Sequence, residues 1–171
     1  MSKAAARAVS TGVLGGVMIV LFVTQGLLFW AGLIAWAGLV AAGGDTAAFK
    51  KGIGGYVLGA ALAWVALVTT HLIVVESDSW LWMPRIGAAV AVTLFVLVLA
   101  SKIDIFSSIP ASLTAYGALI GAYSIPIMQL DGWARLTGLH LYNPIIQVVL
   151  SMILGGVFGL LSTRFEAGLS K

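Results

Sequence analysis

The residues that could do chemistry in this sequence are few, and the charged ones lie mainly at the ends of long apolar runs. The 171 residues include six acids and two histidines. A charge held inside a bilayer is costly, so an ionisable side chain there marks an ion or proton pathway. By position, Asp104 and His71 come nearest to that role, and we treat them as candidate gating or coupling groups. An interfacial ion pair for Asp104 and simple hydration of His71 are the alternatives.

Uncharged polar side chains near and within the apolar runs offer a second kind of chemistry, which is hydrogen bonding to a polar solute. Gln25, Ser112 and Thr114 are the candidates for such a pathway. In hydrocarbon every polar group needs a partner, so hydrogen bonding between helices is the alternative for them. The same alternative applies to Gln147 and Ser151.

Catalytic and metal chemistry are not expected. The chain has no cysteine, which excludes disulfides, thiolate metal sites and cysteine nucleophiles. His71 and His140 have no carboxylate cluster in the sequence that would complete a metal site. No acid–base pair, nucleotide-binding pattern or basic patch for nucleic acid is visible. We expect no enzyme, no cofactor and no nucleic-acid partner.

The composition predicts a membrane protein. Hydrophobic residues make up 61% of the chain and charged residues 9%, whereas charged residues form about a quarter of a soluble domain. Six helices of about 20 apolar residues would use most of the length. The apolar runs do not alternate as barrel strands do. We therefore expect an all-α polytopic membrane protein with six transmembrane helices and one domain over residues 1–171.

The apolar runs also place the helices. The first run, residues 8–44, would be about 55 Å long as one helix, against a hydrocarbon core of about 30 Å. It should fold back near residues 25–29. The expected segments are 9–27, 30–44, 53–74, 85–102, 107–126 and 143–163. The second is short, so a partial, re-entrant helix is the alternative.

Lysine and arginine positions orient these segments, because cytoplasmic loops carry the positive excess. With the N-terminus inside, only Arg85 and Arg135 fall outside. Six spans with both termini cytoplasmic are therefore favoured, and a re-entrant second segment is disfavoured. The residues on the inner side are Lys3, Arg7, Lys50, Lys51, Lys102, Arg164 and Lys171.

An alignment within the sequence predicts an internal repeat, with chance matching in a chain rich in alanine, glycine and leucine as the alternative. Residues 30–43 align with residues 110–123, which lie 80 positions later, and residues 58–60 resemble residues 154–156, which lie 96 positions later. The repeat halves are residues 8–75 and 85–164. Each half has three helices, and an odd number requires that the halves be inverted relative to each other. Inverted three-plus-three repeats are common in transporters and channels.

Small residues recur along one face of the second and fifth segments and allow close backbone approach. If these faces meet at the pseudo-two-fold axis, the aligned aromatic residues Trp36 and Tyr116 would shape a pathway. Gln25, Ser112 and Thr114 would supply its hydrogen bonds. Tight packing within the bundle or between subunits is the alternative. The small residues are Ala31, Ala35, Gly38, Ala42, Ala111, Ala115, Ala118 and Ala122.

Several short patterns resemble a known family. They are the run Leu27–Trp36, the Gly43-Gly44 and Lys51-Gly52 steps, the Ala63-Trp64 pair, and in the second half Ser108-Ile-Pro110 and Gly155-Gly-Val-Phe-Gly159. Together they resemble the domain of unknown function 1097 family of small bacterial inner-membrane proteins. The resemblance covers most of the chain and implies a bacterial inner-membrane location. The matching patterns consist of glycine, alanine and tryptophan and contain no catalytic residue. The resemblance therefore implies an architecture and no particular activity.

These observations favour a passive channel or facilitator for a small, uncharged polar solute such as urea, a short amide, ammonia or a polyol. Its partners would be the lipid bilayer, the solute and further copies of the chain in a homo-oligomer. A non-transporting membrane subunit or scaffold of a larger complex is the first alternative. An ion-coupled small-solute carrier that uses Asp104 or His71 is the second.

Overall fold

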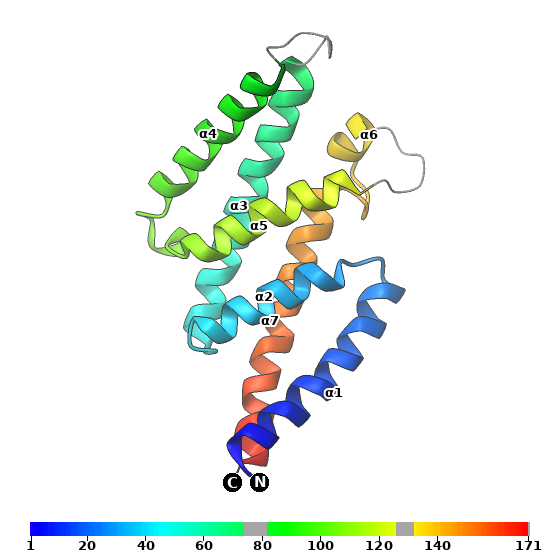
Figure 1. Cartoon of the computed structure of the whole chain (residues 1–171), viewed down its shortest axis with the longest axis vertical. Coiled ribbons are helices and arrows are strands. Elements are labelled where there is room, and N and C mark those ends of the chain that lie inside the picture. Colours follow the sequence, from blue (N-terminus) through cyan, green and yellow to red (C-terminus); the bar gives the residue numbers. More distant parts are fainter. Residues whose placement is uncertain (74–81, 126–131, 171) are drawn as a thin grey trace.

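The computed structural model describes residues 1–73, 82–125 and 132–170, and over these ranges the chain is helical without strands (Figure 1). The start of α1 and the end of α7 lie side by side (Figure 1). The elements in chain order are α1 (Lys3–Thr24), α2 (Phe29–Ala41), α3 (Thr46–Ile73), α4 (Trp82–Ala100), the 3-10 turn η1 (Asp104–Phe106), α5 (Ile109–Ser124), α6 (Gly132–Thr137) and α7 (Pro144–Leu169).

Each of the six predicted segments overlaps one helix: α1, α2, α3, α4, α5 and α7. The ends predicted at residues 74 and 126, like Lys171, lie outside the described residues. Four described helices, α1, α3, α4 and α7, are long and apolar enough to cross a membrane. The other two are short, with 13 residues in α2 and 16 in α5, which is about 20 Å and about 24 Å at the usual helical rise.

Local sequence signals account for the helix boundaries. The chain turns back between Thr24 and Phe29, where the prediction placed the turn, through Gly26 at φ 69°. Gly43 and Gly44, at φ 109° and 70°, make the turn between α2 and α3, a conformation that glycine adopts without a steric penalty. Pro110 and Pro144 lie in the first turns of α5 and α7, where a missing backbone N–H is harmless.

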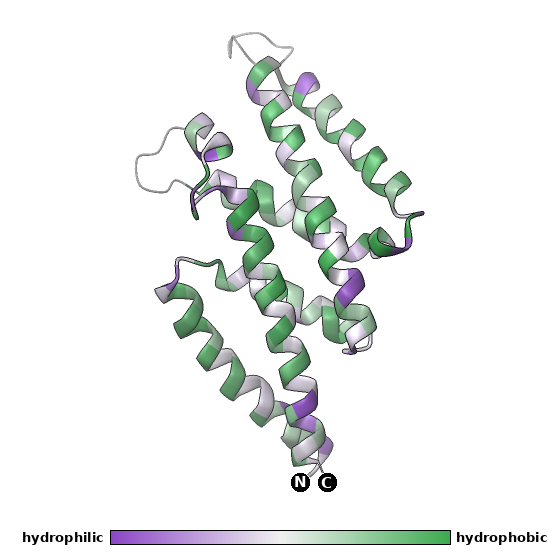
Figure 2. Ribbon diagram, turned by 180° about the vertical axis from the view of Figure 1, so that it is seen from behind, coloured by the Kyte–Doolittle hydropathy of each residue, from purple (hydrophilic) through white to green (hydrophobic). Residues whose placement is uncertain are grey.

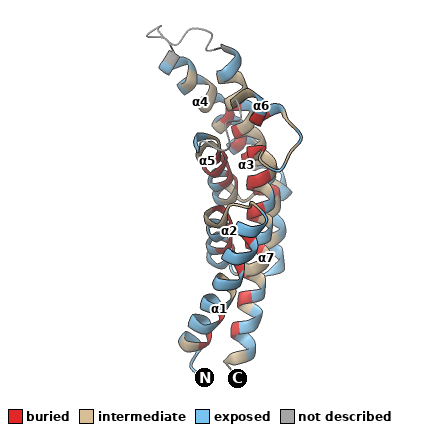
Figure 3. Ribbon diagram, turned by 90° about the vertical axis from the view of Figure 1, so that its right-hand side faces the viewer, coloured by how far each residue is buried: buried red, intermediate tan, exposed pale blue. Residues whose placement is uncertain are grey.

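The two long helices α3 and α7 contact each other, and each carries one long and one short helix. The helices α4 and α5 pack against α3, whereas α1 and α2 pack against α7. Figures 1 and 3 show α2 and α5 over one face of the α3 and α7 pair. The main core lies between these four helices and α4, and it contains alanines with Leu97, Leu119, Val148 and Met152.

Two helix crossings are closed by glycine. A Cβ atom at Gly155 of α7 would overlap the carbonyl oxygen of Gly32 in α2, and one at Gly59 of α3 would overlap the carbonyl oxygen of Ser112 in α5. The backbones are thus in direct contact at both crossings. Close approach of this kind increases the van der Waals contact that holds helices together in lipid, where hydrophobic exclusion contributes little.

The outer helices α1 and α4 present apolar side chains outward and lie at opposite edges of the molecule (Figures 1 and 2). Val20 and Val23 of α1 are 62% and 66% exposed, and Val92 and Phe95 of α4 are 61% and 65% exposed. Such a surface is unfavourable in water and matches hydrocarbon. Together with the apolar spans, it makes this chain a helical membrane protein.

Candidate functional site

A cavity of about 210 Å³ lies between α2, α3 and α5. Its walls are mostly small or aliphatic, and no charged residue lines it in the described part of the chain. Gly38 and Ala42, from the small-residue face of α2, border it together with Ala111 of α5. The small-residue faces predicted for α2 and α5 therefore do not pack together completely here, and a cavity remains between the helices.

Three hydroxyl groups line this cavity, from Tyr56, Ser108 and Thr114. The Thr114 hydroxyl donates to the carbonyl oxygen of Ala111 at 2.9 Å, and the Tyr56 hydroxyl donates to that of Ala35 at 3.2 Å. A hydroxyl that donates one hydrogen bond retains lone pairs that can accept another. The described lining of the cavity can thus accept hydrogen bonds from a solute, and it contains no charged side chain.

Two helix ends of opposite polarity also meet at the cavity. Ala41, the last residue of α2, lines it together with Pro110 in the first turn of α5. The C-terminal end of a helix carries a partial negative charge and the N-terminal end a partial positive charge. A neutral molecule with both donors and acceptors suits this field better than an ion of either sign.

A more open hollow of about 370 Å³ continues from the cavity toward the helix ends and shares Ala42, Ala48 and Ser108 with it. We call this hollow the vestibule. It is lined by Asp45 and Lys51, and the Asp45 carboxylate accepts a hydrogen bond from the backbone N–H of Ala48 at 2.7 Å. Charged residues thus line the vestibule, whereas no charged residue among those described lines the cavity.

On the side of the cavity away from the vestibule, buried side chains fill the interior. Ala35, Ala115, Leu119 and Met152 are each 1% exposed or less and belong to one core cluster. The cavity therefore ends inside the protein in this conformation.

The three residues predicted to supply hydrogen bonds along a pathway do not lie together in the structure. Thr114 lines the cavity. Ser112 is fully buried at the crossing with Gly59 and donates to the carbonyl oxygen of Ser108 at 3.2 Å. Gln25 is exposed just after the end of α1.

Trp36 and Tyr116 pack in different clusters. Trp36 stacks on Phe158 of α7, with ring centroids 6.4 Å apart. The Tyr116 hydroxyl hydrogen-bonds the Thr93 hydroxyl of α4 at 2.8 Å. The two aromatic residues thus turn toward the outer helices α1 and α4, and neither lines the cavity.

The two candidate gating residues lie near helix ends. The ring of His71 stacks on that of Trp133, with centroids 5.3 Å apart. Asp104 in η1 forms an ion pair with Lys51 at 3.0 Å, and its side chain is 87% exposed. Of the two, only Asp104 is connected to the vestibule, through its contact with Lys51.

A buried polar cluster holds the α1–α2 turn to α7. The Gln147 side chain donates to the carbonyl oxygen of Gly26 at 2.6 Å, and the Ser151 hydroxyl accepts from the backbone N–H of Leu28 at 2.9 Å. These contacts are the hydrogen bonds between segments that the sequence offered as the alternative for Gln147 and Ser151.

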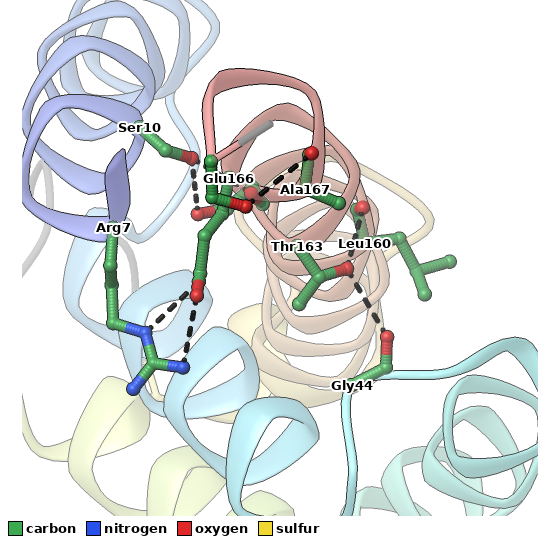
Figure 4. Close-up of polar contacts among 9 residues, drawn as sticks. Arg7, Ser10, Gly44, Leu160, Thr163, Glu166 and Ala167 are labelled. Carbon is green, nitrogen blue, oxygen red and sulfur yellow. Dashed lines mark hydrogen bonds and ion pairs between the residues drawn. The ribbon is translucent and has the colours of Figure 1, made fainter. Parts of the chain in front are cut away.

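An ion pair that sequence reasoning missed joins the two ends of the chain (Figure 4). Arg7 donates to both carboxylate oxygens of Glu166, at 2.9 Å and 3.2 Å. One turn along each helix, the hydroxyl groups of Ser10 and Ser162 are 2.8 Å apart. The pairing partners are 159 residues apart in the chain, so no local spacing could have revealed them.

Replacing either partner of this ion pair should lower the unfolding temperature modestly. Arg7→Gln and Glu166→Gln should have similar effects, and the double variant should be no less stable than either single one, because both remove the same interaction. The differences in unfolding temperature between the variants and the unaltered chain should become smaller in high salt, because the Arg7 side chain is 60% exposed and salt screens exposed charges. Thermal unfolding of the full chain in detergent measures this, with the exposed Arg164→Gln as control. Additive losses in the double variant would contradict the pairing.

A second missed residue is Arg135 of α6, which is only 3% exposed. Its guanidinium donates to the carbonyl oxygens of Ala122, Tyr123 and Ile125, at 3.1, 3.3 and 2.8 Å. These carbonyls lie at the C-terminal end of α5, where the helix leaves them without internal donors. The side chain thus caps α5.

Comparison with known proteins gives one family. The family model described as protein of unknown function (DUF1097) matches residues 8–167. No curated protein and no solved structure matches the chain.

Proposed function

The chain belongs to the DUF1097 family, and from that premise we propose that it is a passive facilitator for a small, uncharged polar solute of the urea, amide, ammonia or polyol class. The observation that carries the proposal is the cavity between α2, α3 and α5, whose described lining has three hydroxyl groups and no charged residue. Its two helix ends of opposite polarity favour a dipolar molecule over an ion.

An inverted three-plus-three repeat is part of this proposal, and the two glycine crossings support it. Gly32 and Ser112 are separated by the same 80 positions as the aligned segments, and Gly59 and Gly155 by the same 96. The carbonyl oxygen of Gly32 meets the missing Cβ of Gly155, and the carbonyl oxygen of Ser112 meets the missing Cβ of Gly59. The packing supports it too, because α1 and α2 lie on α7 as α4 and α5 lie on α3.

Six spans in a bacterial inner membrane, with both termini cytoplasmic, complete the architecture that we propose. In Figure 1 the start of α1, the α2–α3 turn, η1 and the end of α7 follow the lower left margin, whereas the α1–α2 turn and α6 lie toward the upper right. A helix of 28 residues such as α3 is about 42 Å long and must tilt to fit a core of about 30 Å. The shorter α2 and α5 would cross more directly.

Permeation through this site requires movement, because buried core residues close the cavity on one side. The helices α2 and α5 are the elements best placed to move, since they cover one face of the α3 and α7 pair. A small separation of their small-residue faces would extend the cavity across the interior. The glycine crossings would act as fixed contacts for that motion.

The test is stopped-flow light scattering on proteoliposomes challenged in turn with urea, acetamide, glycerol and salt. We expect faster relaxation than in protein-free vesicles for one neutral solute and none for salt. Gly38→Leu should abolish the acceleration, because Gly38 lines the cavity and has free space around its Cβ position. Thr114→Val should slow it by about fivefold, as expected for one lost hydrogen bond.

Two matched controls separate the cavity from general effects. Gly117→Leu also enters open space but lies outside the cavity. Thr24→Val removes a hydroxyl that, like that of Thr114, donates to its own helix backbone. Both controls should permeate like the unaltered chain. Equal rates in Gly38→Leu and Gly117→Leu would rule out this cavity as the path.

The second candidate function is a non-transporting membrane subunit, alone or as a homo-oligomer. The exposed apolar side chains on α1 and α4 support it, because such surfaces can bind another transmembrane helix as well as lipid. Absence of acceleration for every solute, together with recovery of a stable larger complex, would favour this function. An ion-coupled carrier would instead show dependence on an ion gradient that is lost in Asp104→Asn or His71→Ala.

A further inference from the structure

A groove of about 680 Å³ lies beside the vestibule, between the first half of α3 and η1. It combines two surfaces. One is apolar, with Ile53, Val57 and Ile105, and the other is basic, with Lys50 and Lys51. In Figure 2 a hydrophilic stretch interrupts the otherwise apolar α3 near its start.

The apolar wall is both exposed and firmly built. Val57 is 45% exposed and Ile105 is 57% exposed. A Cβ atom at Gly54 would overlap the carbonyl oxygen of Ile105, so η1 is pressed directly onto α3. The apolar wall is therefore held in place by the contact between α3 and η1, and its exposed side chains can pack against an apolar ligand.

The basic rim carries an excess of positive charge. Lys51 pairs with Asp104 at 3.0 Å, whereas Lys50 is exposed and forms no ion pair with any described residue. Asp104 is the only acid among the groove's described lining residues. The charge of Lys50 is thus not neutralised by a described acid, and Lys51 could contact a bound anion as well as Asp104.

We infer that this groove binds an anionic phospholipid, with its phosphate at Lys50 and Lys51 and an acyl chain along Val57 and Ile105. An anion with a long apolar tail matches both surfaces of the groove at once. Basic pockets at the membrane surface typically bind such headgroups. The assignment requires only that the chain lies in a membrane and does not depend on solute transport.

The test uses native mass spectrometry of the full chain in detergent, with phosphatidylglycerol and phosphatidylcholine of identical acyl chains in competition. We expect preferential retention of phosphatidylglycerol. Lys50→Gln and Lys51→Gln should each reduce that preference by about fivefold, as expected for one lysine near an anionic surface. Asp104→Asn should increase it, because it frees Lys51 and removes a repelling charge.

Lys3→Gln is the matched control, since it removes an exposed lysine that does not line the groove. It should leave the preference unchanged. Equal retention of the two lipids by the unaltered chain, an equal loss in Lys3→Gln, or no gain in Asp104→Asn would overturn the assignment. The gain expected in Asp104→Asn cannot result from misfolding.

A further arm adds glycerol 3-phosphate, which has a similar phosphate and no acyl chain. It should not displace phosphatidylglycerol at millimolar concentration, because the acyl chain supplies much of the binding free energy. Displacement by glycerol 3-phosphate would show a site for free phosphate compounds and would overturn the lipid assignment.

Discussion

Gly59→Val and Gly155→Val should each leave little folded protein in the membrane. At either position the new side chain would overlap a backbone carbonyl of the neighbouring helix, that of Ser112 or Gly32. A backbone cannot move aside as a side-chain rotamer can, so the helices must separate. Overpacking by a few carbon atoms already costs about 1–3 kcal/mol, and the close contact that holds the helices together is lost as well. The yield of monodisperse protein after detergent extraction measures the effect.

Gly117→Val is the control for this prediction. Gly117 also lies in an apolar helix, but a Cβ atom there meets nothing within 4 Å. This variant should extract normally, and Gly117→Ala should be slightly more stable, because alanine favours the helix over glycine by about 0.8–1 kcal/mol. Yields from Gly59→Val and Gly155→Val that match Gly117→Val would refute the close crossings.

The same glycines show how far the sequence could predict the fold. The repeat alignment identified the segments around Gly59 and Gly155. Six described helices overlap the segments that the apolar runs predicted, whereas α6 was not predicted. Small residues spaced by four did not show which pairs meet. Gly12 and Gly16, spaced like Gly155 and Gly159, meet nothing within 4 Å. A small residue permits close approach on any face of a helix, and only the tertiary arrangement decides which face has a neighbour.

The candidate site was predictable only in part for a related reason. Thr114 was identified as a polar residue on α5, and it lines the cavity. Tyr56 was not identified, because an aromatic residue in an apolar run is usually a core residue. Trp36 follows Ala35 on α2, and successive helical residues point about 100° apart. Ala35 therefore turns toward the core, while the aromatic ring of Trp36 packs against Phe158.

Arg135→Met should destabilise the end of α5 and lower the unfolding temperature of the whole protein. The variant preserves much of the apolar bulk and removes the donors to three backbone carbonyls. A buried carbonyl left without a donor costs about 1–3 kcal/mol. The bond to Ala122 is buried and the other two are partly buried, so the total should be of order 3 kcal/mol. Arg135→Lys should recover part of this, because a single ammonium group lacks the guanidinium's planar array of donors. Thermal unfolding in detergent measures the loss.

Arg85→Met is the matched control, because Arg85 is exposed and the described residues provide it no ion pair. It should leave the unfolding temperature nearly unchanged. The contrast also bears on topology, since Arg85 and Arg135 are the basic residues that the positive-inside pattern places outside. The Arg135 guanidinium donates its hydrogen bonds to backbone carbonyls. Its position is therefore explained by the capping of α5 and is weak evidence for the orientation of the chain in the membrane. Equal unfolding temperatures for Arg135→Met and Arg85→Met would show that the cap contributes nothing to stability.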